Sequence, residues 1–253
     1  MPSRDKESYS IQAVENALDV LEALSEEDED VRISQLSEKL HMNKTSVFRL
    51  LATFENRGYV EREEASGKYR LGLSAYEIGQ KFLSRMGLLR HARPVMERLS
   101  RTCNEAVYLA VCRRNDVLFL DMVDTTQKVK IVPLVGKRYP LSETAAGLVL
   151  LAFGASGGNG KGQQQSPPLQ GQLDAICNQG YAIDQGDLGE GIATVASPLF
   201  GSNGKLHGAL CIVGPEFRLP EEMIRNELLP LLLEASNIIS SKLGWHSSYM
   251  PRN

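Results

Sequence analysis

The spacing of apolar residues changes once along this chain, and the change divides its 253 residues into two parts. Up to about residue 103, apolar side chains recur three or four residues apart, as on one face of a helix. From about residue 104 the pattern moves towards alternation, which is typical of β-strands. We therefore expect a helical first part and a second part that combines strands and helices, in the α+β class.

The first part predicts three short helices and a hairpin. We expect Ser10 to cap the first helix, Ser34 the second and Asn43 the third, which spans residues 44 to 56 and ends at Gly58. The first helix has five apolar residues at helical spacing, which we expect to face inward: Val14, Ala17, Leu18, Leu21 and Leu24. The third has four: Val47, Leu50, Leu51 and Phe54. Two short strands, 59 to 61 and 68 to 71, follow around a turn, which completes a winged helix-turn-helix.

The second part begins after a connecting helix. Ser74 is the expected cap of that helix, and Pro94 fits the start of the next helix better than its middle. We expect strands at 106–112, 117–123, 128–134, 181–185, 192–200 and 205–213. We expect further helices at 142–153, capped by Ser142, and at 221–243. The segment 154–172, rich in Gly and Gln, predicts a surface loop.

Charge is distributed unevenly in a chain whose formal net charge is −3. The acidic residues of the first part concentrate in one run, Glu26 to Asp30, which predicts a solvated loop. Residues 39 to 70 instead hold seven basic residues against four acidic ones. The third helix and the hairpin therefore form a basic region inside an acidic chain.

Several classes of function find no support in the residues. The four His have no metal-ligand spacing, the four Cys form no C-x-x-C pair, and no catalytic motif or paired-carboxylate spacing appears. We expect no enzyme, no cofactor and no metal. A redox role for Cys112 beside Arg113 and Arg114 is a minor alternative. No apolar run is long enough to cross a membrane, so we expect no membrane partner and a cytoplasmic protein.

The outward face of the third helix has the composition of a recognition helix. Short donors alternate there with cations that can reach phosphates or guanine edges. Solvation of an ordinary exposed helix is the simpler alternative, but the helix, turn, helix and wing order favours double-stranded DNA as the partner. The predicted DNA-binding residues are Lys44, Thr45, Ser46, Phe48, Arg49 and Thr53 on the helix and Lys68, Tyr69 and Arg70 on the wing.

The segments TSVFRLLATFENRGYVERE and GKYRLG resemble the winged helix-turn-helix of the IclR family of bacterial transcriptional regulators. The resemblance continues through GKRYPLSETAAGLVLLAF, GYAIDQGDLGEGIATVASPLF and LHGALCIVGP, and so covers nearly the whole chain. It implies a DNA-binding domain at residues 1–73, a linker helix at 74–90 and a GAF-like effector-binding and oligomerisation domain at 91–253. It also implies dimers that pair into tetramers on operator DNA.

The resemblance places a small-molecule effector between the expected strand 128–134, the start of the helix after Ser142 and the later strands. The implied effector-binding residues are Ile131, Ala145, Ala146, Asp184, Ile192, Thr194, Cys211 and Val213. Positions 211 and 213 are often Ser in the family, so Cys and Val offer fewer hydrogen bonds here. The amino end of the helix after Ser142 could still hold an anion. We therefore expect a small organic acid, a carboxylate, or an aromatic metabolite.

Residue-by-residue alternatives stay open in the second part. Asp184 fits an Asx-type turn or cap as well as a ligand contact, Cys211 fits a small core residue, and Thr194 fits a strand position. The family usually has His where Ser142 stands, and its segment 154–172 is longer. An alternative function is therefore a DNA-binding regulator whose second domain only oligomerises and binds no small molecule.

Overall fold

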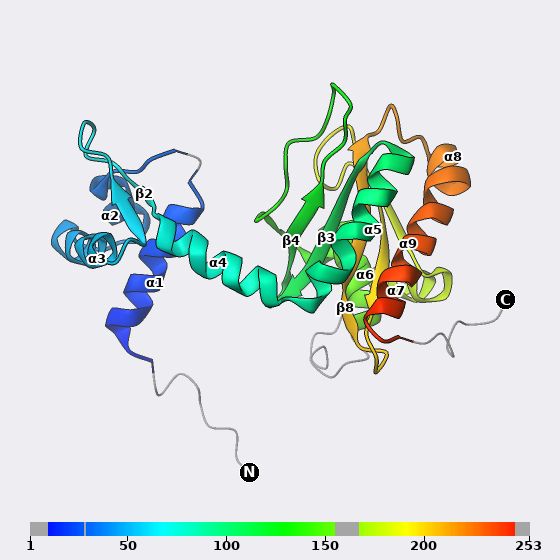
Figure 1. Ribbon diagram of the computed structural model, residues 1–253, viewed down its shortest axis with the longest axis horizontal. Coiled ribbons are helices and arrows are strands. Elements are labelled where there is room, and N and C mark those ends of the chain that lie inside the picture. The colour runs from blue at the N-terminus through cyan, green and yellow to red at the C-terminus, as the bar shows by residue number, and fades with distance from the viewer. Residues whose placement is uncertain (1–9, 28, 155–166, 246–253) are drawn as a thin grey trace, which may run out of the picture. The chain divides into compact units, whose positions relative to one another are not determined.

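The computed structural model describes residues 10–27, 29–154 and 167–245 (Figure 1). The chain separates into two compact units, Met1–Arg85 and Met86–Asn253. The elements of the first unit are α1 Gln12–Ser25, α2 Ile33–Lys39, α3 Lys44–Asn56, β1 Val60–Arg62, β2 Tyr69–Leu71 and α4 Leu73–Arg85. The expected three helices, hairpin and following helix are all present.

The core of the first unit is small and sits between the three helices and the hairpin. Its fully covered residues include Val20, Leu36, Val47, Leu51 and Tyr69. β1 and β2 pair antiparallel, and the backbone of Val31 bonds that of Tyr69 in both directions, at 2.9 and 2.7 Å. The segment before α2 therefore extends the hairpin and ties the wing to the helices.

Three local predictions in the first unit were wrong. α1 begins after Ile11 rather than Ser10, whose hydroxyl bonds Glu15 instead, and α2 begins after Arg32 rather than Ser34. Arg32 is favoured because its backbone N–H donates to the side chain of Gln35, one half of a capping box. Two α1 residues expected inside, Val14 and Leu18, are 52% and 50% exposed, since only the carboxyl-terminal half of α1 lies against the core.

The second unit is built on one antiparallel sheet of six strands in the order β5-β4-β3-β8-β7-β6. Its strands are β3 Ala106–Arg113, β4 Asp116–Val123, β5 Arg138–Pro140, β6 Ala182–Gln185, β7 Ile192–Phe200 and β8 Leu206–Pro215. Its helices are α5 Gly87–Cys103, α6 Ala145–Gly154, α7 Pro167–Gln179, α8 Glu221–Met223 and α9 Leu229–Lys242, with a 3-10 turn Leu141–Glu143 and a π-helical turn Ile224–Leu228. The expected α+β class is confirmed.

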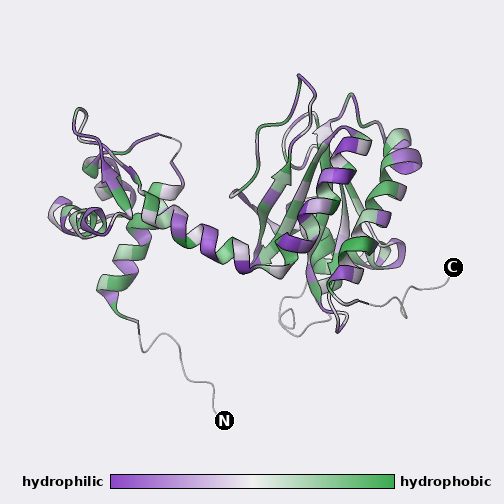
Figure 2. Cartoon of the chain, in the orientation of Figure 1, coloured by the Kyte–Doolittle hydropathy of each residue, from purple (hydrophilic) through white to green (hydrophobic). Residues whose placement is uncertain are grey.

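Helices cover both faces of this sheet. α5 and α9 pack on one face over a core that includes Leu109, Leu210 and Ile212, while α6 and α7 pack on the other over Ala106, Tyr108 and Cys211. Alternation along the strands sends successive side chains to opposite layers. Figure 2 shows the resulting apolar interior, with hydrophobic residues along the strands and along the helix sides that face them.

Residues 128–134, expected as an edge strand, form no strand. Lys and apolar residues alternate there, but a strand needs a backbone partner, and the strand that pairs with the outer edge of β4 is β5, at Asp116–Leu118. The segment instead belongs to the connection between β4 and β5, here called the 124–135 loop. Ile131 and Leu134 of this loop still pack against the α6 side of the core.

Helix boundaries in the second unit also differ from expectation. α6 begins after Thr144 rather than Ser142, because the Thr144 hydroxyl accepts a hydrogen bond from the Gly147 N–H at 3.0 Å. Pro94 lies inside α5, whose buried stripe, Ala92, Met96 and Leu99 among others, continues past it. Part of the expected loop 154–172 is helical, since α7 starts at Pro167. Residues 155–166 of that expected loop lie outside the described part of the chain.

In the described part of the chain, no helix combines the length and the apolar character that a membrane span requires.

Candidate nucleic-acid interface and ligand site

Helix α3 is defined at both ends by hydrogen bonds that its own sequence supplies. The side chain of Asn43 accepts the Ser46 N–H at 2.8 Å and caps the amino end, as expected. At the carboxyl end the Tyr59 N–H bonds the Phe54 carbonyl and the Gly58 N–H bonds the Glu55 carbonyl, each at 2.9 Å. This is a Schellman motif, and Gly58 adopts the positive φ of 72° that the motif requires.

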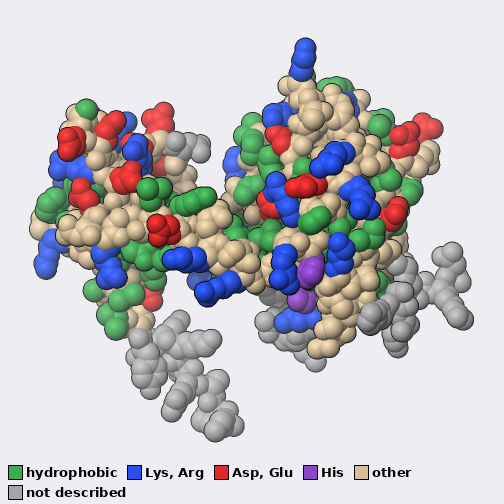
Figure 3. Space-filling model, in the orientation of Figure 1, with side chains coloured by type: hydrophobic (Ala, Val, Ile, Leu, Met, Phe, Trp, Pro, Cys, Tyr) green, Lys and Arg blue, Asp and Glu red, His purple; other side chains and the backbone are tan. Residues whose placement is uncertain are grey.

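The predicted recognition residues lie along the outward side of α3. Lys44, Thr45, Phe48, Arg49 and Thr53 are exposed, and Ser46 is half-buried at the capped end. Phe48 is 50% exposed, which is unusual for a side chain of this size. Neither Lys44 nor Arg49 forms an ion pair with an acidic residue of the described ranges. Figure 3 shows Lys and Arg side chains on the α3 side of the unit, interspersed with Asp and Glu.

The three predicted wing residues have different surroundings. Tyr69 is only 2% exposed and belongs to the core, so its ring is not presented at the surface. The Arg70 guanidinium pairs with Glu61 at 3.2 Å and lies 3.9 Å from Asp30, so its charge is already compensated. Lys68 is half-buried and lines a depression of about 580 Å³ together with acidic residues of the run that follows α1: Glu26, Glu27, Glu29 and Asp30.

Arg62 is a wing cation that the sequence interpretation did not select. It stands opposite Tyr69 in the β1–β2 register, and its guanidinium lies 5.8 Å from the centre of the Tyr69 ring. Arg62 is exposed and makes no ion pair within the described residues. Strand alternation, which puts residue 69 on the opposite face from residues 68 and 70, could have shown that Tyr69 points inward, but it gives no signal for Arg62.

The expected ligand residues come together on the α6 side of the sheet. Asp184 on β6 stands beside Thr194 on β7, and Thr194 stands beside Val213 on β8. Such cross-strand neighbours project from the same face of a sheet. Val213 and three more expected residues, Ala145, Ala146 and Cys211, are completely buried in the same cluster. Ile131 and Ile192 are partly buried and pack against it.

Two polar atoms in this cluster, one on Asp184 and one on Thr194, have no hydrogen-bond partner. Asp184 is 7% exposed, and its Oδ2 accepts the N–H of Ala145, the first residue of α6, at 2.7 Å. Its other oxygen, Oδ1, has no partner, and neither does the hydroxyl of the completely buried Thr194. An unpartnered buried polar atom is costly in a folded protein and calls for an explanation such as a missing ligand. The Tyr108 hydroxyl, which the sequence interpretation missed, is a third such group.

Burial controls the protonation of these side chains. Burial raises the pKa of Asp184 to about 7, and the negative charge of Asp187 adds to this, while the N–H groups of Ala145 and Asp187 act in the opposite direction. Burial likewise raises the pKa of Tyr108 to about 12 and that of the Cys211 thiol far above its usual range. Tyr108 and Cys211 are therefore neutral near pH 7, and Asp184 is the group that titrates there.

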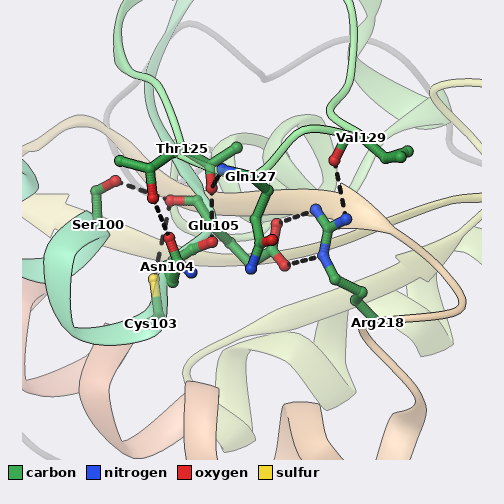
Figure 4. Close-up of polar contacts among 9 residues, drawn as sticks. Ser100, Cys103, Asn104, Glu105, Thr125, Gln127, Val129 and Arg218 are labelled. Carbon is green, nitrogen blue, oxygen red and sulfur yellow. Dashed lines mark hydrogen bonds and ion pairs between the residues drawn. The ribbon is translucent and has the colours of Figure 1, made fainter.

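A buried ion pair fastens the 124–135 loop to the sheet (Figure 4). Arg218 makes a bidentate pair with Glu105, Nε to Oε1 at 2.6 Å and Nη2 to Oε2 at 2.8 Å, and its Nη1 donates to the Val129 carbonyl at 2.8 Å. Nearer the start of the loop, the Thr125 hydroxyl donates to the Asn104 carbonyl at 2.6 Å. These contacts hold the loop that carries Ile131 over the α6 side of the core.

Comparison with known families supplies the decisive observation. The IclR helix-turn-helix domain matches residues 13–64, and the C-terminal domain of the bacterial transcriptional regulator IclR matches residues 80–158 and 164–241. This chain belongs to the IclR family. IclR proteins are transcriptional regulators and not enzymes, so this chain is a DNA-binding transcriptional regulator of the IclR type.

Relatives of this IclR protein match over most of their length. The transcriptional regulator KdgR of Escherichia coli K12 is 31% identical, over 96% of each chain, and KipR of Bacillus subtilis is 31% identical, over 84% of this chain and 90% of its own. A crystal structure of an IclR homolog from Microbacterium hydrocarbonoxydans, complexed with 4-hydroxybenzoate, is 25% identical with a TM-score of 0.74, covering 91% of this chain and 98% of its own. An IclR regulator from Alicyclobacillus acidocaldarius has the same fold, with a TM-score of 0.80 and 22% identity over 93% of this chain and all of its own.

Proposed function

We propose that this regulator binds an operator through α3 and that a small organic acid or aromatic metabolite, bound on the α6 side of the sheet, changes its affinity for that DNA. The buried, unpartnered atoms Asp184 Oδ1 and Thr194 Oγ1 carry the second half of this proposal. Around them the cluster is apolar, with Ile131, Cys211 and Val213, which suits the hydrocarbon part of such a ligand. The relative complexed with 4-hydroxybenzoate gives a precedent for an aromatic acid in this family.

The proposed DNA contacts follow the exposure of α3. Lys44 and Arg49 supply charge for phosphates or guanine edges, and Thr45, Ser46 and Thr53 supply short donors. The exposed ring of Phe48 can meet a thymine methyl group. On the wing we assign the phosphate contacts to Lys68, Arg70 and Arg62, with Arg70 exchanging its exposed pair with Glu61 for a phosphate oxygen. Tyr69 supports the wing from inside, through its packing and its backbone bonds to Val31.

We also propose that residues 1–73 act as the DNA-binding domain, 74–90 as the linker helix and 91–253 as the effector-binding and oligomerisation domain, in a cytoplasmic homodimer or homotetramer. Two recognition helices are needed to read two operator half-sites. Large apolar side chains at the surface of the first unit support self-association, because exposed apolar patches mark interaction sites. They are Ile11, Val14 and Leu18 at α1 and Leu73, Tyr76, Ile78 and Phe82 on α4.

The alternative function, a regulator whose second unit only oligomerises, is favoured by one observation. Asp184 itself bonds the amino end of α6, and Cys211 and Val213 leave the neighbouring walls apolar. In that case no ligand would be required for DNA binding or for its control.

Melting of the effector unit tests the two functions against each other. The purified chain is heated with a panel of small aliphatic and aromatic acids that includes 4-hydroxybenzoate. An effector raises the melting temperature, because a ligand that binds only the folded state stabilises it. The same acid should fail to stabilise Thr194→Val, while Thr45→Val, on α3, should respond like the wild type. If no acid raises the melting temperature of the wild type or of Thr45→Val, the oligomerising regulator is favoured.

DNA binding is tested with sequences selected from a random duplex library. Lys44→Ala and Arg49→Ala should each weaken binding to the selected operator, by about 1–3 kcal/mol where the side chain reads a base edge. Lys205→Ala, a substitution in the hairpin between β7 and β8, is the matched control and should bind normally. Unchanged binding by both α3 variants would refute the recognition-helix assignment.

A further inference from the structure

The amino end of α6 is already occupied by groups of this chain. Three of its first four N–H groups have partners: Ala145 bonds Asp184 Oδ2, Gly147 bonds the Thr144 hydroxyl, and Leu148 bonds the Thr144 carbonyl at 2.8 Å. A helix amino terminus normally attracts an external anion through these donors and the helix dipole. Here the chain supplies its own carboxylate to the Ala145 N–H, so an incoming carboxylate does not find that donor vacant.

An incoming carboxylate would instead meet the second oxygen of Asp184. Asp184 Oδ1 and Thr194 Oγ1 project from adjacent strands on the same face of the sheet, and neither has a partner. Thr194 can donate its hydroxyl proton to a ligand oxygen. An ionised Asp184 has no proton to donate, so Oδ1 and a ligand carboxylate would be two acceptors facing each other without a hydrogen bond.

The charges around Asp184 do not compensate a second negative charge. The described segments of α6 and β7 carry no charged residue, and Cys211 on β8 is a neutral thiol. Asp187, in the turn after β6, is also acidic. On the 124–135 loop, which packs against the same side of the core, Lys130 is paired with Asp124 and Lys128 is exposed. Like charges that share a buried site cannot both stay ionised, and one carboxyl group takes up a proton.

We propose that a carboxylate effector enters this site together with one proton, which Asp184 carries on Oδ1 and donates to the effector carboxylate. This inference rests on the proposed function and specifies the ligand chemistry of that same site. The proton comes from solvent and forms an O–H bond at Oδ1, while Oδ2 keeps its bond from the Ala145 N–H. The net charge of the complex is then one unit more positive than the summed charges of the ionised protein and the ionised ligand.

The proposal predicts an affinity that depends on pH in a definite direction. Because the pKa of Asp184 in the free protein is about 7, this group is mostly protonated at about pH 6 and mostly ionised at about pH 8. A ligand that requires the protonated form therefore binds about tenfold more weakly at the higher pH. A neutral amide of the same ligand carries its own N–H donors, so its affinity should stay constant or increase with pH.

Asp184→Asn is the informative variant, because asparagine has the shape and the donor of the protonated acid. Its side-chain oxygen can accept the Ala145 N–H while its amide group donates to the ligand. The variant should bind carboxylates at about pH 8 as tightly as the wild type does at about pH 6, and the pH dependence should disappear. Asp187→Asn removes a neighbouring charge but not the proton site, so it should keep the dependence and shift its midpoint to lower pH.

The experiment is isothermal titration of the full chain and both variants with acetate, benzoate and 4-hydroxybenzoate, and with the three corresponding amides. Each carboxylate titration is repeated in buffers of different ionisation enthalpy, which counts the protons taken up by the wild type without relying on a variant. We expect uptake approaching one proton per bound carboxylate at about pH 8 and little uptake at about pH 6. Carboxylate binding with equal affinity at both values and no proton uptake would overturn this inference but leave the proposed function intact. No binding of any carboxylate or amide would overturn both.

Discussion

Replacement of Arg218 by methionine removes the buried ion pair with Glu105. The two side chains are 19% and 5% exposed, and two hydrogen bonds of 2.6 and 2.8 Å join them. Removing one partner of a buried pair costs about 3–5 kcal/mol, because the remaining charge is left without compensation. Since Arg218 retains some contact with solvent, we expect a loss of about 2–3 kcal/mol in the stability of the second unit. The bond to the Val129 carbonyl is lost as well.

Thermal melting followed by circular dichroism measures this effect. A loss of that size lowers the melting temperature of a unit of this length by roughly 5–10 °C. Arg225→Met is the matched control, because Arg225 makes only exposed contacts, an ion pair with Glu221 and a 3.2 Å bond to the Tyr181 hydroxyl, and this substitution should leave melting nearly unchanged. Adding Glu105→Gln to Arg218→Met should recover part of the loss, since it removes the uncompensated charge. Equal melting temperatures for the two arginine variants would refute the account of the buried pair.

Three further predictions concern the buried wing residue Tyr69, the wing cation Arg62 and the carboxyl group of Asp184. Tyr69→Ala should lower the stability of the first unit by about 3 kcal/mol, as for other core aromatics, whereas Arg70→Ala should melt like the wild type in the same assay. Arg62→Ala should weaken binding to all DNA sequences about equally and reduce the salt slope by about one unit in anisotropy titrations; an unchanged slope would exclude a phosphate contact. The folded-state pKa of Asp184, about 7, lies above its unfolded value of about 3.9, so the folded chain holds the extra proton and stability falls as pH rises between these values. The full effect is on the order of 4 kcal/mol, and melting of Asp184→Asn should lack this contribution to the pH dependence.

The first unit could be predicted well because its signals are local. The Asn43 cap, the Val47 and Leu51 stripe and the Gly58 terminus lie within one helix and its ends, and all three are present. The error at Tyr69 came from grouping three consecutive wing residues by chemistry, although a strand turns alternate residues to opposite faces. Exposure of Leu18 on α1 depends on what the rest of the unit covers, and no local pattern reports that.

The second unit was harder to predict because its deciding contacts join distant residues. Alternation at residues 128–134 could not show that β4 pairs with residues 138–140 and not with this segment. The bond between Asp184 and Ala145 spans 39 residues, so the sequence left ligand contact and cap as equal alternatives for Asp184. In the structure one oxygen forms the cap and the other is unpartnered. Pro167 opens α7, as prolines at a first helical turn do, in a segment whose Gly and Gln content indicated a loop.

The most direct test of ligand-controlled DNA binding measures operator affinity while the acid is bound to the same protein. Fluorescence anisotropy gives the affinity of the full chain for its selected operator, with and without a saturating concentration of an acid that raises its melting temperature. We predict a change of about 5- to 150-fold in affinity, the range of typical allosteric coupling, and no change for Thr194→Val. An operator affinity that stays the same while the acid is bound would contradict the account.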